Sequence, residues 1–294
     1  MSDRAVVVVR AGALTTVQDL GRTGYAHLGV PRSGALDPAA VGLVNRLVGN
    51  AETAAVLETT VDGCALRPRR AVTVAVGGAP CPVRVDGHPA AWGAAVRVPA
   101  GSVLEIGAAT RGLRAYVAIG GGIDVEPVLG SRSTDLLSGL GPAPLAVETV
   151  LPLGPEPGGT RAGAAVRGAV DAAPWPGPPG ELVLRIRLGP REDWFTAAAL
   201  RTLATRAYRV SPASNRIGLR LEGPALERAR HGEPASEGMV LGAVQVPPDG
   251  RPVVFLADHP TTGGYPVVGV VREADLGAAA QAVPGTPVRF APVR

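Results

Sequence analysis

The side chains best suited to chemistry lie close together near the C-terminus. The stretch from Asp258 to Gly264 reads D-H-P-T-T-G-G and presents a carboxylate, an imidazole and two hydroxyl groups before a glycine pair. Glycines let backbone N–H groups come close to a ligand. Short, β-branched apolar runs flank the stretch at 252–257 and 265–271, so we expect two strands joined by a loop. Because a simple reversal needs only two to five residues, the stretch indicates either a small-molecule site on a rigid frame or an ordinary long hairpin loop with a solvated tip.

A second polar stretch, 15–37, shows neither a helical nor a strand period. Segments of this length inside a compact domain are usually functional when they are ordered. The stretch contains Gln18, Asp19 and Arg22. Arg22 could hold a carboxylate through two parallel hydrogen bonds. The alternative is a structural ion pair between Asp19 and Arg22 that pins the loop.

Three more polar residues stand at strands. Asn215 and Arg216 mark the entry to the expected strand 216–221, where they could form a donor pair or bond one loop to another between the two halves of the chain. Gln245 lies between Val244 and Val246, so it should face the side opposite those valines. A buried glutamine needs hydrogen-bond partners, and a ligand or the protein interior would supply them equally well.

The elements that must position these residues are mostly strands. Gly 40 and Pro 29 are spread along the chain, which is typical of a β-rich fold with many tight turns. Asp62-Gly63 and Asp86-Gly87 are hairpin-turn signals. Asp37 is expected to cap a helix that Pro38 begins, and further helices are expected at 193–204 and 273–282. We expect domains at 1–160 and 181–294, joined by a Gly/Pro-rich linker at 161–180.

Composition excludes several classes of protein. The chain of 294 residues contains no lysine, so all 29 basic residues are arginine. This excludes a Walker-A phosphate loop, a Schiff-base lysine, a Ser–Ser–Lys amidase triad and covalent biotin attachment within the chain. Cys64 and Cys81 form no C-x-x-C pattern, which favours a reduced, cytoplasmic protein. The N-terminal residues do not resemble a signal peptide, and no apolar run is long enough to span a membrane.

Charge and histidine spacing suggest few ionic partners. The net charge is +4, but the arginines are scattered and aromatic residues are only 3%, so we expect no nucleic-acid binding. His27, His88 and His231 fit no metal-ligand spacing, so no metal is expected. His259 precedes a proline and is expected to be exposed rather than catalytic, and Cys64 is expected to pack inside the protein.

Three motifs stand out together: T-T-V-Q-D-L-G-R-T-G with V-P-R-S-G-A-L-D and N-R-L-V-G-N, then S-N-R-I-G-L-R-L-E-G, and finally G-A-V-Q-V-P-P-D-G-R-P-V-V-F-L-A-D-H-P-T-T-G-G-Y-P. In order and spacing they resemble one known family, the biotin-dependent carboxyltransferases, also called allophanate hydrolase subunit 2. The resemblance extends over nearly the whole chain except the linker. It implies a mainly β fold of two cyclophilin-like β-barrels with a few short helices.

The resemblance also implies an activity and partners. Family members include the C component of the bacterial, ATP-dependent 5-oxoprolinase, which opens 5-oxoproline to glutamate, and part of urea carboxylase, which moves a carboxyl group from carboxybiotin to urea. We expect an enzyme subunit of the first kind, with the second as the alternative. A regulatory protein that binds a homologue of the sporulation kinase inhibitor without catalysis is a further alternative. The expected partners are a companion subunit related to that inhibitor and a third hydrolase subunit or a biotin carrier, with ATP used by the complex and carboxybiotin supplied in trans.

These reactions act on a planar amide or ureide whose oxygen becomes negatively charged, so they need oriented donors and a base. Asp258 is the expected base, and Asp258→Asn is then expected to impair catalysis more than folding. Asp19 and Arg22 are the other expected catalytic residues. The expected substrate-binding residues are Gln18, Ser33, Asn215, Arg216, Gln245, Thr261, Thr262, Gly263, Gly264 and Tyr265.

Overall fold

The chain divides into two compact units. The computed structural model describes residues 3–156 and 179–293, so most of the predicted linker at 161–180 lies outside the described residues. The first unit comprises Met1–Arg22, Asp37–Thr134 and Gly139–Gly177, and the second comprises Thr23–Leu36, Asp135–Ser138 and Pro178–Arg294. Two short segments from the first half of the sequence therefore belong with the C-terminal unit.

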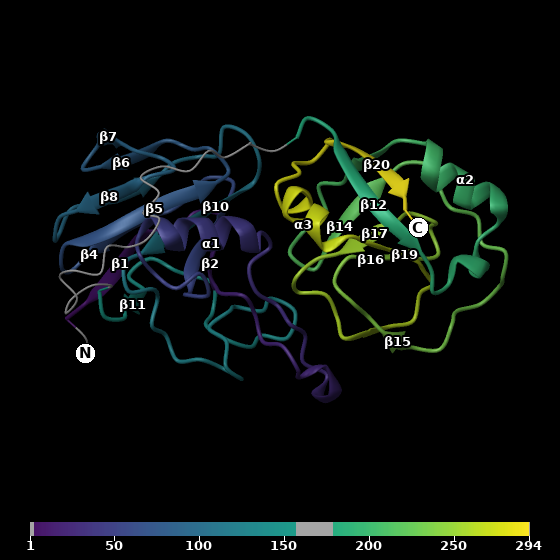
Figure 1. Ribbon diagram of the computed structural model, residues 1–294, viewed down its shortest axis with the longest axis horizontal. Coiled ribbons are helices and arrows are strands. Elements are labelled where there is room, and N and C mark those ends of the chain that lie inside the picture. Colours follow the sequence, from purple (N-terminus) through teal and green to yellow (C-terminus); the bar gives the residue numbers. More distant parts are fainter. Residues whose placement is uncertain (1–2, 157–178, 294) are drawn as a thin grey trace. The chain divides into compact units, whose positions relative to one another are not determined.

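The first unit is built from two antiparallel sheets that enclose an apolar core (Figure 1). The six-stranded sheet has, in spatial order, β11 (Val150–Pro152), β1 (Ala5–Arg10), β4 (Ala65–Pro68), β9 (Leu104–Ile106), β6 (Val83–Val85) and β7 (His88–Ala90). The five-stranded sheet has β2 (Leu14–Gln18), β3 (Val56–Thr60), β10 (Arg114–Ile119), β5 (Val72–Gly78) and β8 (Ala95–Val98). Strand β2 thus takes in the start of the stretch 15–37, for which no period was expected.

Helix α1 (Pro38–Leu47) packs on β10 and β5. As predicted, the Asp37 side chain caps it by accepting a hydrogen bond from the Ala40 N–H at 3.1 Å. Val41 and Val44 are fully buried on its inner face. The capped and buried start of α1 therefore holds the C-terminal end of the polar stretch 15–37 in place.

The two predicted hairpin turns differ in outcome. Asp86 and Gly87 have φ values of 48° and 78° and join β6 to β7, as their sequence indicates. Asp62-Gly63 does not form a hairpin, because β3 and β4 belong to different sheets. Gly63 is nevertheless required, since a Cβ there would lie 2.2 Å from the Ile106 carbonyl oxygen at a φ of +68°.

The second unit is a closed barrel of seven strands (Figure 1). Its order is β12 (Leu182–Leu188), β19 (Val267–Val271), β16 (Ala243–Gln245), β17 (Val253–Phe255), β14 (Gly218–Glu222), β13 (Tyr208–Val210) and β20 (Pro287–Pro292). Parallel pairing of β12 with β20 closes the ring. Leu184, Ile186 and Val244 are among the fully buried residues of its core. The predicted mainly β fold is confirmed.

The helices of this unit are short. The predicted helix at 193–204 consists of the 3₁₀ helix η2 (Glu192–Trp194) and helix α2 (Ala197–Thr205), because Phe195 is extended and Thr196 caps α2. Helix α3 (Glu273–Ala280) follows β19, and η1 (Ala26–Leu28) lies in the segment 23–36. Within residues 3–156 and 179–293, no helix combines the length and apolar character that crossing a membrane requires.

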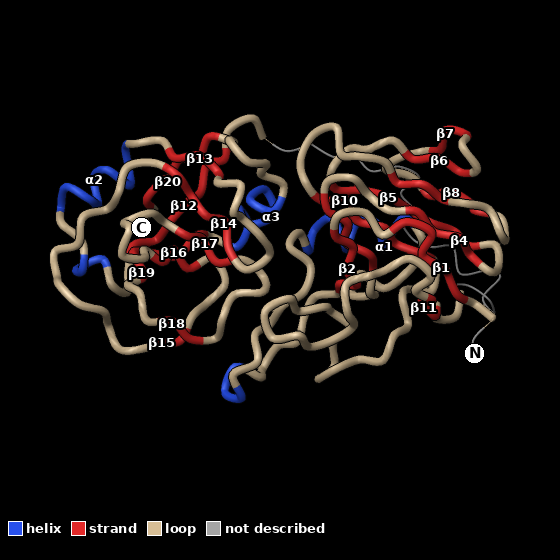
Figure 2. Tube along the Cα trace, turned by 180° about the vertical axis from the view of Figure 1, so that it is seen from behind, coloured by secondary structure: helices blue, strands red, loops and turns tan. Residues whose placement is uncertain are grey.

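The segment around Asp258 is not an ordinary hairpin loop, which was one of the two interpretations of the sequence. Strands β17 and β19 do not pair with each other, because both pair with β16, which lies between them. The connecting residues therefore cross from one side of β16 to the other. On the way, β18 (Thr262–Gly263) pairs with β15 (Glu237–Gly238), a two-stranded ribbon outside the barrel (Figure 2).

Candidate functional site

The second unit holds a buried ion pair between Arg216, two residues before β14, and Asp258, which follows β17. Arg216 Nε lies 2.9 Å from Asp258 Oδ2, and its Nη2 lies 3.1 Å from Oδ1. The two side chains are 1% and 0% exposed. The backbone N–H of Asp258 also donates to the Arg216 carbonyl oxygen at 3.1 Å. The geometry is thus a bidentate pair on adjacent strand ends.

Two loop segments are attached to this pair. Ser33 Oγ donates to Asp258 Oδ1 at 2.7 Å, and the Leu136 N–H donates to Oδ2 at 3.2 Å. Arg216 Nη2 donates in turn to the Gly34 carbonyl oxygen at 2.6 Å. Ser33 has a φ of 52°, which a non-glycine residue adopts only when its surroundings enforce it. The Asp258 carboxylate therefore accepts four hydrogen bonds and organises segments 23–36 and 135–138.

His259 is buried, which corrects the expectation that it is exposed. Its side chain is 6% exposed and stacks on Phe255 with ring centroids 6.0 Å apart. The chain turns back here, since the His259 N–H donates to the Leu256 carbonyl oxygen. Packing against Phe255 buries the imidazole ring. The expectation of exposure rested on the proline that follows His259, which gives no information about this contact.

The His259 ring has a defined tautomer. Nδ1 lies 2.7 Å from the Pro260 carbonyl oxygen. Because a carbonyl oxygen only accepts, we assign the proton to Nδ1, which leaves a lone pair on Nε2. Nε2 has no hydrogen-bond partner in the part of the chain that the structure describes. Burial lowers the pKa of His259, so the ring is neutral near pH 7 and Nε2 can accept a proton.

Gln245 lies beneath the ribbon strand β18. Its Nε2 donates to the Tyr265 carbonyl oxygen at 3.2 Å, and a Cβ on Gly263 would come within 2.7 Å of that nitrogen. The predicted alternation holds: Val244 and Val246 belong to the barrel core, whereas Gln245 contacts Met239 of a separate cluster. Glycine at position 263 therefore lets the ribbon approach the amide.

The remaining predicted residues of this unit lie nearer the surface. Thr262 is exposed, Tyr265 is 40% exposed, and Thr261 and Gly264 are half-buried. Asn215 is exposed, and its Oδ1 accepts from the N–H groups of Ile217 and Gly218 at 2.9 and 3.2 Å. Asn215 therefore shapes the turn that directs its neighbour Arg216 inward, and the two do not form a donor pair.

The first unit brings Asp19 to a serine-rich loop. Its carboxylate accepts from Ser131 Oγ, Ser133 Oγ and the Arg132 N–H, each at 2.6 Å, and from the Gly21 N–H at 2.8 Å. No ion pair between Asp19 and Arg22 occurs among the described residues. The sequence did not single out these serines for a site, because they become neighbours of Asp19 only through the fold.

Arg22 and Gln18 are buried with unused hydrogen-bonding capacity. Arg22 is 2% exposed; its Nη2 donates to the Ser133 carbonyl oxygen at 2.5 Å, whereas Nη1 has no partner among the described residues. Gln18 is fully buried; its Nε2 donates to the Thr134 carbonyl oxygen at 2.9 Å, and its Oε1 has no described partner. Each unpaired buried group costs about 1–3 kcal/mol. The donor Arg22 Nη1 and the acceptor Gln18 Oε1 are thus available to a polar ligand or to water. Their side chains bind the carbonyl oxygens of two consecutive residues, Ser133 and Thr134.

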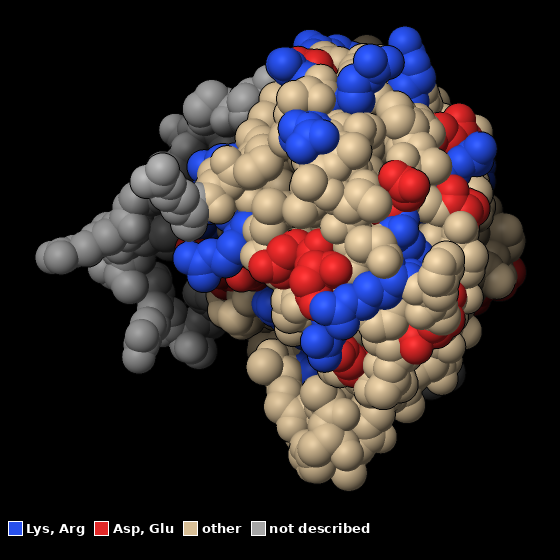
Figure 3. Space-filling view, turned by 90° about the vertical axis from the view of Figure 1, so that its right-hand side faces the viewer, with Lys and Arg blue, Asp and Glu red and all other residues tan. Residues whose placement is uncertain are grey.

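Neither the two cysteines nor a cluster of metal ligands adds to these sites among the residues that the structure describes. Burial raises the pKa of the Cys64 thiol to about 12, which agrees with its predicted packing role. Within the described part of the chain, no three His, Cys, Asp or Glu side chains group closely enough to hold a metal ion. In the view of Figure 3, arginines and acidic side chains are intermingled rather than gathered by sign. The ion pairs of the second unit include Arg191–Glu237 and Arg230–Asp193.

The chain belongs to the carboxyltransferase domain family, subdomains A and B, whose model matches residues 28–292. This confirms the resemblance seen in the three motifs. The chain is 36% identical over 286 residues to the C component of the 5-oxoprolinase of Escherichia coli K12, covering 96% of this chain and 89% of that protein. It is 34% identical to the urea amidolyase of Lachancea kluyveri, covering 98% of this chain but 17% of that protein.

Solved structures agree with these sequence comparisons. The urea carboxylase of Kluyveromyces lactis superposes with a TM-score of 0.87 at 31% identity, covering 99% of this chain and 27% of that one. Another solved relative, 36% identical with a TM-score of 0.85, is matched over 98% of this chain and 55% of its own length. The chain thus corresponds to one part of these longer relatives.

Proposed function

We propose that the chain is a subunit of an ATP-dependent 5-oxoprolinase complex that opens the lactam 5-oxoproline to glutamate. One observation carries the proposal: similarity to the 5-oxoprolinase component of E. coli extends over 96% of this chain and 89% of that relative. The urea amidolyase similarity, by contrast, involves 17% of the relative. The separate 5-oxoprolinase component is therefore the better match in extent as well as in identity.

For the first unit we propose substrate recognition by Arg22 and Gln18. The substrate 5-oxoproline carries a carboxylate, a lactam N–H and a lactam carbonyl group. The unpaired Arg22 Nη1 is a donor suited to the carboxylate, and the unpaired Gln18 Oε1 is an acceptor suited to the N–H. Asp19 would act by holding the loop 131–133 rather than by transferring a proton, because its carboxylate already accepts four hydrogen bonds.

For the second unit, taken by itself, we propose a site of its own in which His259 Nε2 transfers a proton, with Asp258 as the competing candidate. Lactam opening requires a proton to be moved at the reacting centre, and a base works best in its unprotonated form at the operating pH. Neutral His259 meets this requirement. Asp258 would have to give up a hydrogen bond from Arg216, Ser33 or Leu136 before it accepted a proton. The ribbon residues 261–265, with Gln245 beneath them, would line this site of the second unit.

The proposal includes partners. The chain is proposed to act in the cytoplasm only with a companion subunit related to the sporulation kinase inhibitor and with a third, hydrolase subunit, and the complex supplies the ATP-binding function. If the complex uses biotin instead, a separate carrier must present it, because this chain contains no lysine. The relatives called urea carboxylase and urea amidolyase support a second candidate function, the transfer of a carboxyl group to urea.

Two assays on one preparation test the proposal. The chain is co-expressed with its companion subunits, and phosphate release from ATP is measured with 5-oxoproline and, separately, with urea plus bicarbonate. We expect release that depends on 5-oxoproline, and no turnover by the isolated chain. Release that depends on urea instead would favour the second candidate and contradict the first.

A further inference from the structure

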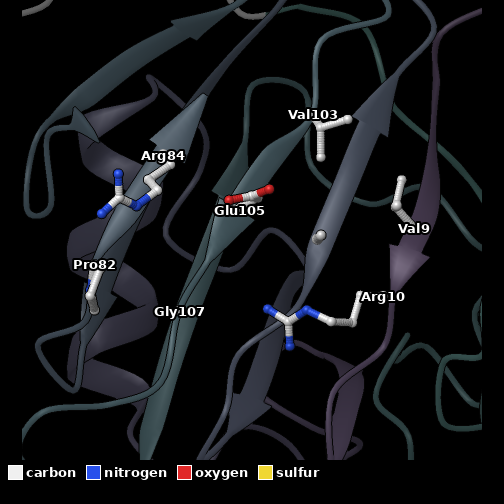
Figure 4. A pocket seen from close by; sticks show the side chains of 8 residues that line it. Val9, Arg10, Pro82, Arg84, Val103, Glu105 and Gly107 are labelled. Atoms are coloured by element: carbon white, nitrogen blue, oxygen red, sulfur yellow. The ribbon is translucent and has the colours of Figure 1, made fainter. Parts of the chain in front are cut away.

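A pocket of about 380 Å³ lies on the six-stranded sheet of the first unit (Figure 4). It is lined by Val9, Arg10, Ala65, Pro82, Arg84, Val103, Glu105 and Gly107. On these strands the alternate residues Val83, Leu104 and Ile106 are buried in the core. The pocket therefore lies on the outer face of the sheet, and it contains none of the candidate site residues.

The charged residues of the pocket form one row across the strands. Across neighbouring strands, Arg10 lies opposite Ala65, Ala65 opposite Glu105, and Glu105 opposite Arg84. Neighbouring strands lie about 4.8 Å apart. The row is therefore a cation, a methyl group, a carboxylate and a second cation, in this order, with an irregularity in β1 between Val8 and Arg10. The small side chain of Ala65 leaves the hollow between Arg10 and Glu105.

Backbone carbonyl oxygens hold the two arginines of the row, but no carboxylate of the described residues forms an ion pair with either of them. Arg10 donates to the carbonyl oxygens of Asp62 and Ile106, each at 2.9 Å, which fixes its guanidinium over the pocket (Figure 4). Arg84 donates through Nη1 to the Gly87 carbonyl oxygen at 3.0 Å and keeps further N–H groups. The Glu105 carboxylate has no hydrogen bond or ion pair with any residue that the structure describes. An unpaired carboxylate thus stands between two arginines.

We propose that this pocket binds a dicarboxylic α-amino acid, with glutamate as the probe. The ammonium group would pair with Glu105, and the two carboxylates with Arg10 and Arg84. A plain dicarboxylate would place no cation on Glu105, and a monocarboxylic amino acid would leave one arginine without an anion. The row of charges is therefore complementary to all three charges of glutamate. Glutamate is also the product of the proposed reaction. A role of this pocket in regulation by product therefore rests on the proposed function, whereas the binding of glutamate to the pocket does not.

Binding is tested on the isolated chain, so the result is independent of any catalytic assay. Backbone amide NMR shifts are followed while L-glutamate, L-glutamine or glutarate is added. We expect glutamate to shift the amides of Ala65, Glu105 and Arg84. Glutamine and glutarate should bind at least tenfold more weakly, because each lacks one charge-assisted hydrogen bond. Glutarate binding as tightly as glutamate, or no shift at these amides at tens of millimolar glutamate, would overturn the proposal.

Variants supply the matched control. Glu105→Gln and Arg84→Gln should each weaken glutamate binding about tenfold or more. Arg67→Gln removes an exposed arginine from β4 of the same sheet, outside the pocket, and should leave binding unchanged. Ala65→Val narrows the hollow without changing charge and should also weaken binding. Equal losses in Arg67→Gln and Arg84→Gln would show that general charge alone attracts the ligand, and would refute the site.

Discussion

Arg216 and Asp258, 42 positions apart in the sequence, form a bidentate ion pair that is almost completely withdrawn from solvent, with N–O distances of 2.9 and 3.1 Å. The pair also holds Ser33, Gly34 and Leu136. Its charges are therefore compensated within the protein, and its first consequence is structural. This alters the expectation that Asp258 contributes to chemistry without contributing to stability.

Removing the charge of Asp258 should destabilise the second unit. Asp258→Asn leaves the buried Arg216 guanidinium without its counter-charge, which typically costs about 3–5 kcal/mol. We expect a clearly lower Tm in thermal unfolding followed by circular dichroism. Asp275→Asn, which removes the partner of the half-exposed Arg185, is the control and should cost much less. If Asp258→Asn keeps the wild-type Tm, the pair is not the structural anchor inferred here.

His259→Gln should separate catalysis from stability. If Nε2 is the proton acceptor, kcat of the complex should fall about 10²-fold, while the Tm of the variant stays near that of the wild type at pH 8. His27→Gln changes an exposed histidine and is the matched control. A fully active His259→Gln complex would return the role of base to Asp258.

The same histidine predicts how stability depends on pH. Burial holds the pKa of His259 below its ordinary value of 6.5, so the unfolded chain binds this proton first as the pH falls. The stability that neutral His259 contributes is therefore present above pH 6.5 and is lost as the pH falls below that value. Urea unfolding from pH 8 to pH 5 should show a steeper loss for the wild type than for His259→Gln. Parallel profiles would contradict this.

Arg22→Lys should weaken substrate binding. Lysine keeps the positive charge but lacks the planar fork that fits a carboxylate. We expect KM for 5-oxoproline to rise about tenfold, a scale set by one charge-assisted hydrogen bond. Arg132→Lys changes a neighbouring arginine that already pairs with Asp124, and KM should stay unchanged. Equal KM values for the two variants would remove Arg22 from substrate recognition.

Adjacent glycines test the ribbon over Gln245. In Gly263→Ala the new Cβ would lie 2.7 Å from Gln245 Nε2, so the amide or the ribbon must shift. Such overpacking costs about 1–3 kcal/mol. In Gly264→Ala the nearest atom is 3.9 Å away, so stability should change little. Denaturant unfolding of both variants measures the difference, and equal stability would mean that the ribbon yields without cost.

Local chemistry made parts of the fold predictable. The Asp37 cap and the Asp86-Gly87 hairpin depend on residues next to each other, so the sequence indicates them directly. Asp62-Gly63 misled, because a turn that needs positive φ can equally join two different sheets. Whether flanking strands pair is a question of topology, which explains why the sequence alone left the hairpin-loop alternative open for the segment around Asp258.

The candidate site was predictable in composition but not in arrangement. The family motifs contain Asp19, Arg22, Ser33, Arg216 and Asp258, and the fold brings the last three together. The burial of His259 depends on packing against Phe255, and the serine partners of Asp19 lie more than a hundred positions away. Such contacts leave no periodic trace in the sequence. Conversely, the absence of lysine excluded covalent biotin on this chain without any structure.

The most direct test of the proposed function is to follow ¹³C-labelled 5-oxoproline by NMR in the presence of ATP and the co-expressed complex. We predict that the lactam carbonyl signal is replaced by the side-chain carboxylate signal of glutamate, and that omitting either ATP or this chain stops the conversion. An unchanged lactam signal under conditions where the same complex carboxylates urea would contradict the proposed function. An unchanged signal without any turnover, while the complex still assembles, would favour a regulatory binding protein instead.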